Sequence, residues 1–329
     1  MLPSFLVNRM MEAAGIMAQA GEAVLACRLS AGVPISAQDD VNGTGYIGLD
    51  SSPITTSLGS LQAKRTSTNP NFAALLVYLL HRAGVEKGDC VAVGASGSFP
   101  ALIVAALSAC RVLGVRPLLV CSLGASQWGA NHPRFHWLNM WECLHETGLF
   151  NTEPAAWSLG GDRDTGQDMD PGGRARLQTA LEGRGLKIIS DPDISRNISE
   201  RMRILRQEAG GEEIKAFINV GGSWANLGTD ESVLKINPGL SMPRDIPVPE
   251  RRGMIQEMAV RGVPVIHCLF IRGLAREFGI PWDPSPLPGP GEGGIFRMAR
   301  ERHPAVTYLI LIYILAVVVM TLLWYRPRL

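Results

Sequence analysis

One stretch constrains the fold of this chain more than any other, and it runs over residues 90–131. A short apolar run at 90–93 predicts a strand that is buried on both faces. Small residues break the run at 94–98, and Pro100 and Gly114 stand where a helix would begin and end. A second apolar run, at 118–121, opens into another loop of small residues. A strand, a helix and a strand in this order predict a parallel crossover unit.

The rest of the chain continues this alternation of strands and helices. Further strands are predicted at residues 186–189, 216–220 and 264–270, and helices at 70–82, 133–147, 171–182, 195–208 and 250–261. Such an alternation predicts an α/β fold with a doubly wound, mostly parallel, Rossmann-like sheet. We assign residues 49–280 to this soluble domain. Residues 1–48 are predicted to form an N-terminal amphipathic helix and a loop.

The C-terminal part of the chain has a different composition. Residues 305–324 carry no charge, and 20 residues at 1.5 Å each are enough to cross about 30 Å of hydrocarbon. We therefore expect one C-terminal transmembrane helix, a short tail at 325–329 and a cell-membrane localisation with a single pass. Residues 281–294 are so rich in proline and glycine that they predict an extended linker, within a juxtamembrane segment at 281–304. Arginines flank the predicted span on both sides, which leaves the side of the soluble domain open.

Composition excludes several kinds of partner and cofactor. The net charge is +1, and no basic run is interleaved with aromatic residues, so no nucleic-acid partner is expected. The six cysteines lie among apolar neighbours without a CxxC pattern, which predicts core residues and neither a disulfide framework nor a metal site. The nucleotide-binding patterns GxxxxGK[ST] and GxGxxG are absent. We predict no metal and no cofactor.

Three predicted strands end in loops of small polar residues, around Ser96, Ser126 and Ser223. In open α/β sheets, ligands bind beyond the carboxyl ends of the strands, so these loops predict one site. Backbone N–H groups before Pro100 and the serine hydroxyls would suit a phosphate or a carboxylate. For each loop, an ordinary tight turn is the alternative. The predicted ligand-binding residues are Lys64, Arg65, Gly94, Gly97, Ser98, Ser126, Asn131, Asn219, Gly221, Gly222 and Ser223.

The first of these loops also permits an enzymatic interpretation. Residues 94–98 nearly match the GxSxG nucleophile elbow and depart from it only by Ser98 in place of the last glycine. Asp191 or Asp193 and then His267 follow in the chain order of an α/β-hydrolase triad. In this interpretation the catalytic residues are Ser96, as the nucleophile, and His267, as its base.

Several long strings in the chain resemble one family. They are AKRTSTNPNFAAL, VAVGASGSFPAL, SLGASQWGAN, NVGGSWANLG and PLPGPGEGG, the last of which precedes the predicted span. Together, from about residue 49 to the end, they are similar to the poly-γ-glutamate system protein family. The resemblance implies a role in a bacterial system that makes and exports poly-γ-glutamate, a capsule or secreted polymer, beside an ATP-using, Mur-ligase-like synthetase. It implies no catalytic residue.

These observations predict a membrane-anchored component of poly-γ-glutamate synthesis or export that binds an anionic ligand at its strand ends. Its expected partners are the other components of that system, the membrane, and the polymer or an anionic precursor. Two alternatives remain open. One is a serine-dependent hydrolase or γ-glutamyl transferase, and the other is a ligand-free membrane scaffold for the synthetase.

Overall fold

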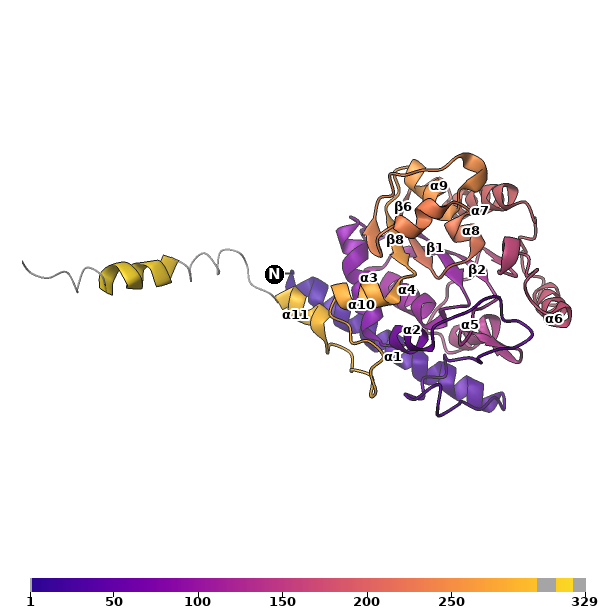
Figure 1. Ribbon diagram of the computed structural model, residues 1–329, viewed down its shortest axis with the longest axis horizontal. Helices are drawn as coiled ribbons and strands as arrows, with labels where there is room; N and C mark the ends of the chain where they lie inside the picture. The colour runs from indigo at the N-terminus through magenta and orange to yellow at the C-terminus, as the bar shows by residue number, and fades with distance from the viewer. Residues whose placement is uncertain (1, 301–311, 322–329) are drawn as a thin grey trace, which may run out of the picture.

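The computed structural model describes residues 2–300 and 312–321, and a six-stranded sheet lies at its centre (Figure 1). The strand order is β5-β2-β1-β6-β8-β7, and every neighbouring pair is parallel except β7 with β8. The strands are β1 (Cys90–Ser96), β2 (Arg116–Ser122), β5 (Ala156–Ser158), β6 (Ile214–Val220), β7 (Gly239–Ser241) and β8 (Val265–Cys268). This confirms the predicted α/β class with a mostly parallel sheet.

Helices cover both faces of the sheet (Figure 1). Val91 and Val93 of β1 enter a core shared with α1, α3, α4 and α5, whereas Cys90 and Ala92 enter a core shared with α7 and α9. The helices are α1 (Ser4–Ser30), α2 (Leu61–Ser67), α3 (Asn71–Arg82), α4 (Pro100–Leu113), α5 (Trp137–Glu146), α6 (Pro171–Glu182), α7 (Ile194–Ala209), α8 (Trp224–Leu227), α9 (Met254–Val260), α10 (Ile271–Glu277) and α11 (Gly294–Arg300). Successive side chains of β1 point to opposite faces of the sheet, and helices cover both faces. The whole strand is therefore buried, as its apolar sequence predicts.

The central crossover unit forms as the sequence indicates. Pro100 is the first residue of α4, and Gly114 after it has the left-handed φ of 66° that favours glycine at a helix end. The chain returns along β2 on one side of β1, and β6 later pairs on the other side. The strand order therefore reverses at β1, and a crevice for a ligand is expected at the carboxyl ends of β1 and β6.

The edges of the sheet differ from the prediction. Residues 186–189 form no strand, and Ile188 makes only an isolated bridge to Trp157. The strand at that edge is β5, which was not predicted. The antiparallel β7 at the other edge was not predicted either. Both of these strands have three residues, which is too short for any periodicity in the sequence to reveal.

A helix forms in the N-terminal part of the chain, as predicted, and it is α1, which begins at Ser4. Its apolar residues recur at helical spacing and are buried against α3, α4 and α5.

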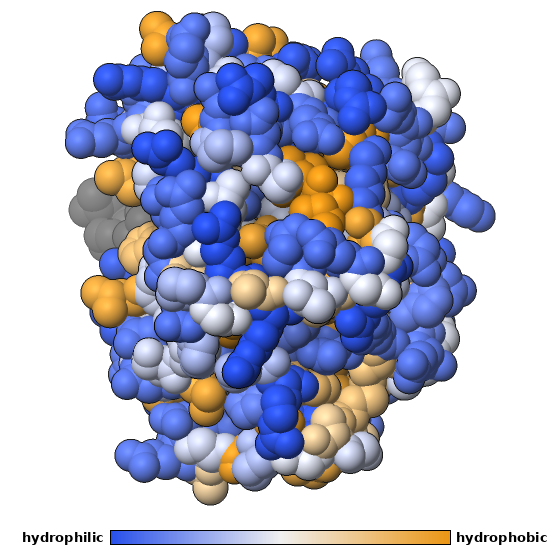
Figure 2. Space-filling view, turned by 90° about the vertical axis from the view of Figure 1, so that its right-hand side faces the viewer, coloured by the Kyte–Doolittle hydropathy of each residue, from blue (hydrophilic) through white to orange (hydrophobic). Residues whose placement is uncertain are grey.

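The face of the molecule in Figure 2 is largely hydrophilic and shows hydrophobic residues only in small groups. Water-facing surfaces of folded domains have this character.

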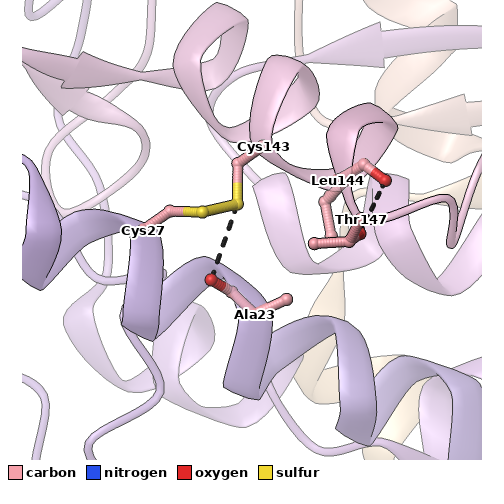
Figure 3. The surroundings of a disulfide bond; sticks show 5 residues. All are labelled: Ala23, Cys27, Cys143, Leu144 and Thr147. Atoms are coloured by element: carbon pink, nitrogen blue, oxygen red, sulfur yellow. Dashed lines mark hydrogen bonds between the residues drawn. A yellow bond between two sulfur atoms is a disulfide. The ribbon is translucent and has the colours of Figure 1, made fainter.

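A disulfide joins Cys27 of α1 to Cys143 of α5, with their Cα atoms 6.4 Å apart (Figure 3). This corrects the prediction that all six cysteines are core thiols. The pair is 116 residues apart in sequence, so no local spacing could indicate it. The dashed line from Cys143 to the carbonyl of Ala23 marks a close approach, because a disulfide sulfur has no proton to donate. The other four cysteines are free and buried, as predicted.

Residues 281–294, which we call the C-terminal strap, contain no helix or strand before Gly294, where α11 begins, as their composition predicts. They are nevertheless packed against the domain. Asp283 forms a salt bridge with Arg65, and the side-chain amide of Asn71 donates to the carbonyls of Gly289 and Glu292. The strap therefore lies along α2 and α3 and is not a free linker.

The predicted membrane span, residues 305–324, falls largely outside the described residues. Only 312–321 of it are described, as a helix, and the tail at 325–329 is outside altogether. Within 2–300 and 312–321, no helix combines the length and the apolar character that crossing a membrane requires. The span stays a prediction.

Candidate functional site

A cavity of about 530 Å³ opens at the carboxyl ends of β1, β2 and β6. Ser96 is the last residue of β1 and Ser98 follows it, Ser126 follows β2, and Gly222 and Ser223 follow β6. All five line the cavity. The remaining walls come from α2 and the segment before it, from the segment after β5, from the loop after β8 and the start of α10, and from the C-terminal strap. The structure thus brings the three predicted loops to one site.

Lys64 of α2 lies at the floor of this cavity and is only 3% exposed. Its Nζ donates to the backbone carbonyl of Ser98 and to Oγ of Ser126, the latter at 2.7 Å. The same nitrogen lies 3.7 Å from the centre of the Phe99 ring. No carboxylate of the described residues pairs with it, and burial lowers the pKa of Lys64 to about 7. Near neutral pH the side chain therefore populates both the ammonium and the neutral amine.

The C-terminal strap holds α2 in place. Arg65 donates from Nε to Oδ1 of Asp283 at 2.6 Å and from Nη2 to Oδ2. The backbone N–H of Asp283 donates in turn to Oγ1 of Thr66 at 2.8 Å. Arg65 was predicted to bind a ligand, but its guanidinium is already occupied by this carboxylate. Its contribution is to fix the helix that carries Lys64.

The serines of the first two loops form a connected row. The N–H of Ser126 donates to Oγ of Ser98 at 3.0 Å, and the N–H of Ser98 donates to Oγ of Ser96 at 3.3 Å. Consequently, the hydroxyls of Ser96 and Ser98 shape the loops, while that of Ser126 meets the Lys64 amine. The row fixes the backbone that presents Ser126.

The predicted pair of Ser96 and His267 is not formed. His267 lies on β8, and β6 separates that strand from β1. Its Nδ1 is 2.9 Å from Nδ2 of Asn219, and burial lowers the pKa of His267 to about 4. No hydrogen bond joins the histidine to Ser96. The two candidate aspartates are also elsewhere, because Asp191 and Asp193 both bind Arg196 at the start of α7.

Besides Arg65, which pairs with Asp283, five predicted ligand-binding residues lie outside the cavity walls. They are Gly94, Gly97, Asn131, Asn219 and Gly221. Asn131 is fully buried, and its side chain holds both the N–H and the carbonyl of Leu49. Gly94 lies under the amide of Asn226, where an added Cβ would come within 2.5 Å of it. Close packing between loops explains these residues.

Several cavity residues were missed by sequence reasoning. Trp224 and Phe270 line the cavity while 42% and 59% exposed, so they stand at its rim. Arg272 lies over the Trp282 ring, 4.8 Å from its centre, and pairs with no carboxylate among the described residues. Phe270 and Arg272 follow β8, and the rule used for the other strand ends could have found them. Trp282 and Asp168 also line the cavity, and neither follows a predicted strand, so the sequence did not indicate them. Burial is the main cause that raises the pKa of Asp168.

The site shows no arrangement for a metal. Across residues 2–300 and 312–321, no three His, Cys, Asp or Glu side chains gather where they could hold a metal ion. No protein-family model matches the chain, and no match is found among curated proteins or solved structures.

Proposed function

We propose that this chain is a membrane-anchored component of poly-γ-glutamate synthesis or export whose domain binds a γ-glutamyl unit of the polymer or of its precursor. The resemblance of the sequence strings supports the system, and the uncharged run at 305–324 supports the single-pass anchor. The cavity supports the ligand, because its volume of about 530 Å³ is typical of small-molecule sites.

The observation that carries the ligand class is the position of Arg272. Its guanidinium lines the same cavity as Lys64, and no carboxylate of the described part of the chain pairs with it. A γ-glutamyl unit has an α-carboxylate and, two methylenes away, an amide carbonyl. Arginine binds carboxylates through two parallel N–H groups, so Arg272 replaces Arg65 as the expected anion contact.

The remaining walls complement the rest of such a unit. The Lys64 amine and the hydroxyl of Ser126 offer polar contacts for the amide at the floor. The exposed rings of Trp224 and Phe270 offer an apolar surface for the methylenes of a chain that enters the cavity. In this arrangement, the carboxylate would lie near the mouth and the amide near the floor.

Binding can be tested on the full chain in lipid nanodiscs by calorimetry with short γ-linked glutamate oligomers. We expect binding that Arg272→Gln weakens by about 10-fold or more, since it removes a charge-assisted contact. Arg276→Gln is the matched control, because Arg276 lies on the same short helix but outside the cavity walls. If the wild type binds no γ-linked oligomer, the ligand-free scaffold becomes the better proposal.

The role in the polymer system needs a cellular test. In a poly-γ-glutamate producer, deletion of the gene should lower the amount or change the length of secreted polymer, and the wild-type gene should restore it. The Arg272→Gln gene should restore it poorly at equal protein level. Unchanged polymer after deletion would exclude the proposed role.

A further inference from the structure

The floor of the cavity contains a contact that ligand binding alone does not require, between the Lys64 amine and the Ser126 hydroxyl. We infer that Ser126 is a nucleophile and Lys64 its general base, in an acyl-transfer reaction on an amide carbonyl bound in the cavity. The identity of the amide, a γ-glutamyl amide, rests on the proposed function. The pair itself rests on the geometry alone.

The geometry meets the requirements of a serine–lysine pair. Nζ and Oγ are 2.7 Å apart, within the reach that proton transfer from a nucleophile to its base needs. The carbonyl of Ser98 and the ring of Phe99 contact the same Nζ, and together they orient the amine. A base held by a third group is the usual pattern in such pairs, and lysine is one of the bases that serves serine.

The surroundings keep the amine available as a base. Lys64 comes from α2, and Ser98, Phe99 and Ser126 surround its nitrogen without contributing any charge. The other ionisable side chains on the cavity walls are Asp168 and Arg272. Burial is the cause of the lowered pKa, which places a large neutral fraction at physiological pH. Ordinary lysine, with a pKa near 10.4, would be almost entirely protonated there.

Ser126 also differs from the other serines at the strand ends. The Oγ atoms of Ser96, Ser98 and Ser223 accept from the backbone N–H groups of Ser98, Ser126 and Asn226. Those three hydroxyls therefore stabilise the backbone conformation of the loops. The hydroxyl of Ser126 meets an amine and lines the cavity, so it is placed for attack on a ligand bound there.

The reaction balances with water or an amine as the second substrate. Neutral Lys64 takes the proton of Ser126 as Oγ bonds to the amide carbonyl carbon. The C–N bond then breaks, the ammonium of Lys64 returns the proton to the leaving amine, and an acyl-serine remains. Water, or the amine of another chain, attacks the acyl carbon and gives a proton to Lys64. The bond from that carbon to Oγ then breaks, and the Lys64 ammonium returns the proton to Oγ. The products are an acid, or a new amide, and the free Ser126 hydroxyl.

The test uses a fluorophosphonate probe, which reacts with activated serines, on the full chain in nanodiscs. We expect one adduct, located on Ser126 by peptide mass spectrometry, with a rate that rises through about pH 7 as Lys64 loses its proton. Ser126→Ala should abolish it. Lys64→Met and Lys64→Arg should each slow it about 100-fold or more, because neither variant supplies a base near neutral pH. Ser122→Ala, at a buried serine of β2 outside the cavity walls, is the matched control and should react like wild type.

The probe carries no carboxylate, so this outcome is independent of the proposed function. Arg272→Gln should lose affinity for γ-linked oligomers and still react with the probe. If folded wild type gives no adduct, or if the adduct is on Ser96, the serine–lysine inference is overturned even where oligomers bind. If Ser126 reacts but oligomers neither bind nor release amine, the proposed ligand is wrong and the pair acts on another acyl compound. Circular dichroism melts establish that each variant is folded.

Discussion

Two basic side chains of this domain are equally buried, and they are held in opposite ways. Lys64 and Arg201 are each 3% exposed. Arg201 forms a salt bridge with the fully buried carboxylate of Asp164, and it also bonds to Oδ1 of Asn197 and Oγ of Ser158, each at 2.9 Å. Among the residues that the structure describes, the Lys64 amine meets only a carbonyl, a hydroxyl and an aromatic ring.

This difference distinguishes a basic side chain that is buried for stability from one that is buried for function. A buried charge is tolerated when an opposite charge and hydrogen bonds replace its water, and the Arg201 cluster satisfies this condition. The cluster also holds Asp164 at a φ of 63°, a left-handed conformation that costs energy outside glycine. Within residues 2–300 and 312–321, no counter-charge pairs with Lys64, and this lysine lines a cavity. Perturbed pKa values accompany function in such a situation.

The largest expected effect comes from breaking the compensated site. Arg201→Met leaves Asp164 buried without its partner, so we expect the free energy of unfolding to fall by about 3–5 kcal/mol, measured by urea denaturation. Adding Asp164→Asn removes the stranded charge and should recover part of the loss. A loss below about 1 kcal/mol for the single variant would mean that the two buried sites are alike.

A second variant tests whether a loss of global stability affects the reaction of Ser126 in the cavity. The disulfide connects α1 with α5, and neither helix contributes to the cavity walls. Cys143→Ser should lower the free energy of unfolding by about 2–4 kcal/mol. The reaction of Ser126 with the fluorophosphonate should nevertheless stay unchanged under native conditions. Loss of that reaction would show that global stability, rather than Lys64, controls the site.

A third test uses pH to isolate the uncompensated lysine. The pKa of Lys64 is about 7 when folded and near 10.4 when unfolded, so between these values the unfolded chain binds more protons. Stability should therefore rise with pH across this window, by up to about 1.4 kcal/mol per pH unit from this group. The buried free cysteines, whose pKa values are raised, act in the opposite direction above about pH 8.5. Subtracting the curve of Lys64→Met from that of wild type removes their contribution, and a flat difference would contradict the lowered pKa.

The smallest effect is expected at the salt bridge that supports the lysine from outside. Arg65 and Asp283 are mostly but not fully buried, at 17% and 15% side-chain exposure. Asp283→Asn should cost about 1 kcal/mol of stability. It should also slow the reaction of Ser126 several-fold, because α2 would hold Lys64 less firmly. An unchanged reaction rate would show that the strap does not position the base.

Sequence reasoning predicted the parts of the fold that local signals encode. Pro100 and Gly114 bound α4, the apolar run at 90–93 lies in β1, and the small residues after each strand reach one edge because parallel strands share it. The pairing of Lys64 with Ser126 could not be predicted, since 62 residues separate them and no spacing records their contact. The GxSxG-like loop was misleading for a physical reason. The candidate base His267 lies two strands away from β1 in the sheet, and only the strand order reveals that distance.

The C-terminal strap links the cavity to the part of the chain that leads toward the predicted span. Trp282 forms part of the cavity wall, and the chain then runs along α3 to the buried Ile295 and Phe296, shortly before the predicted span. Packed contacts therefore hold the chain against the domain as far as Phe296, where a free linker was expected. A pull on the chain beyond Phe296 would be transmitted to a wall of the cavity.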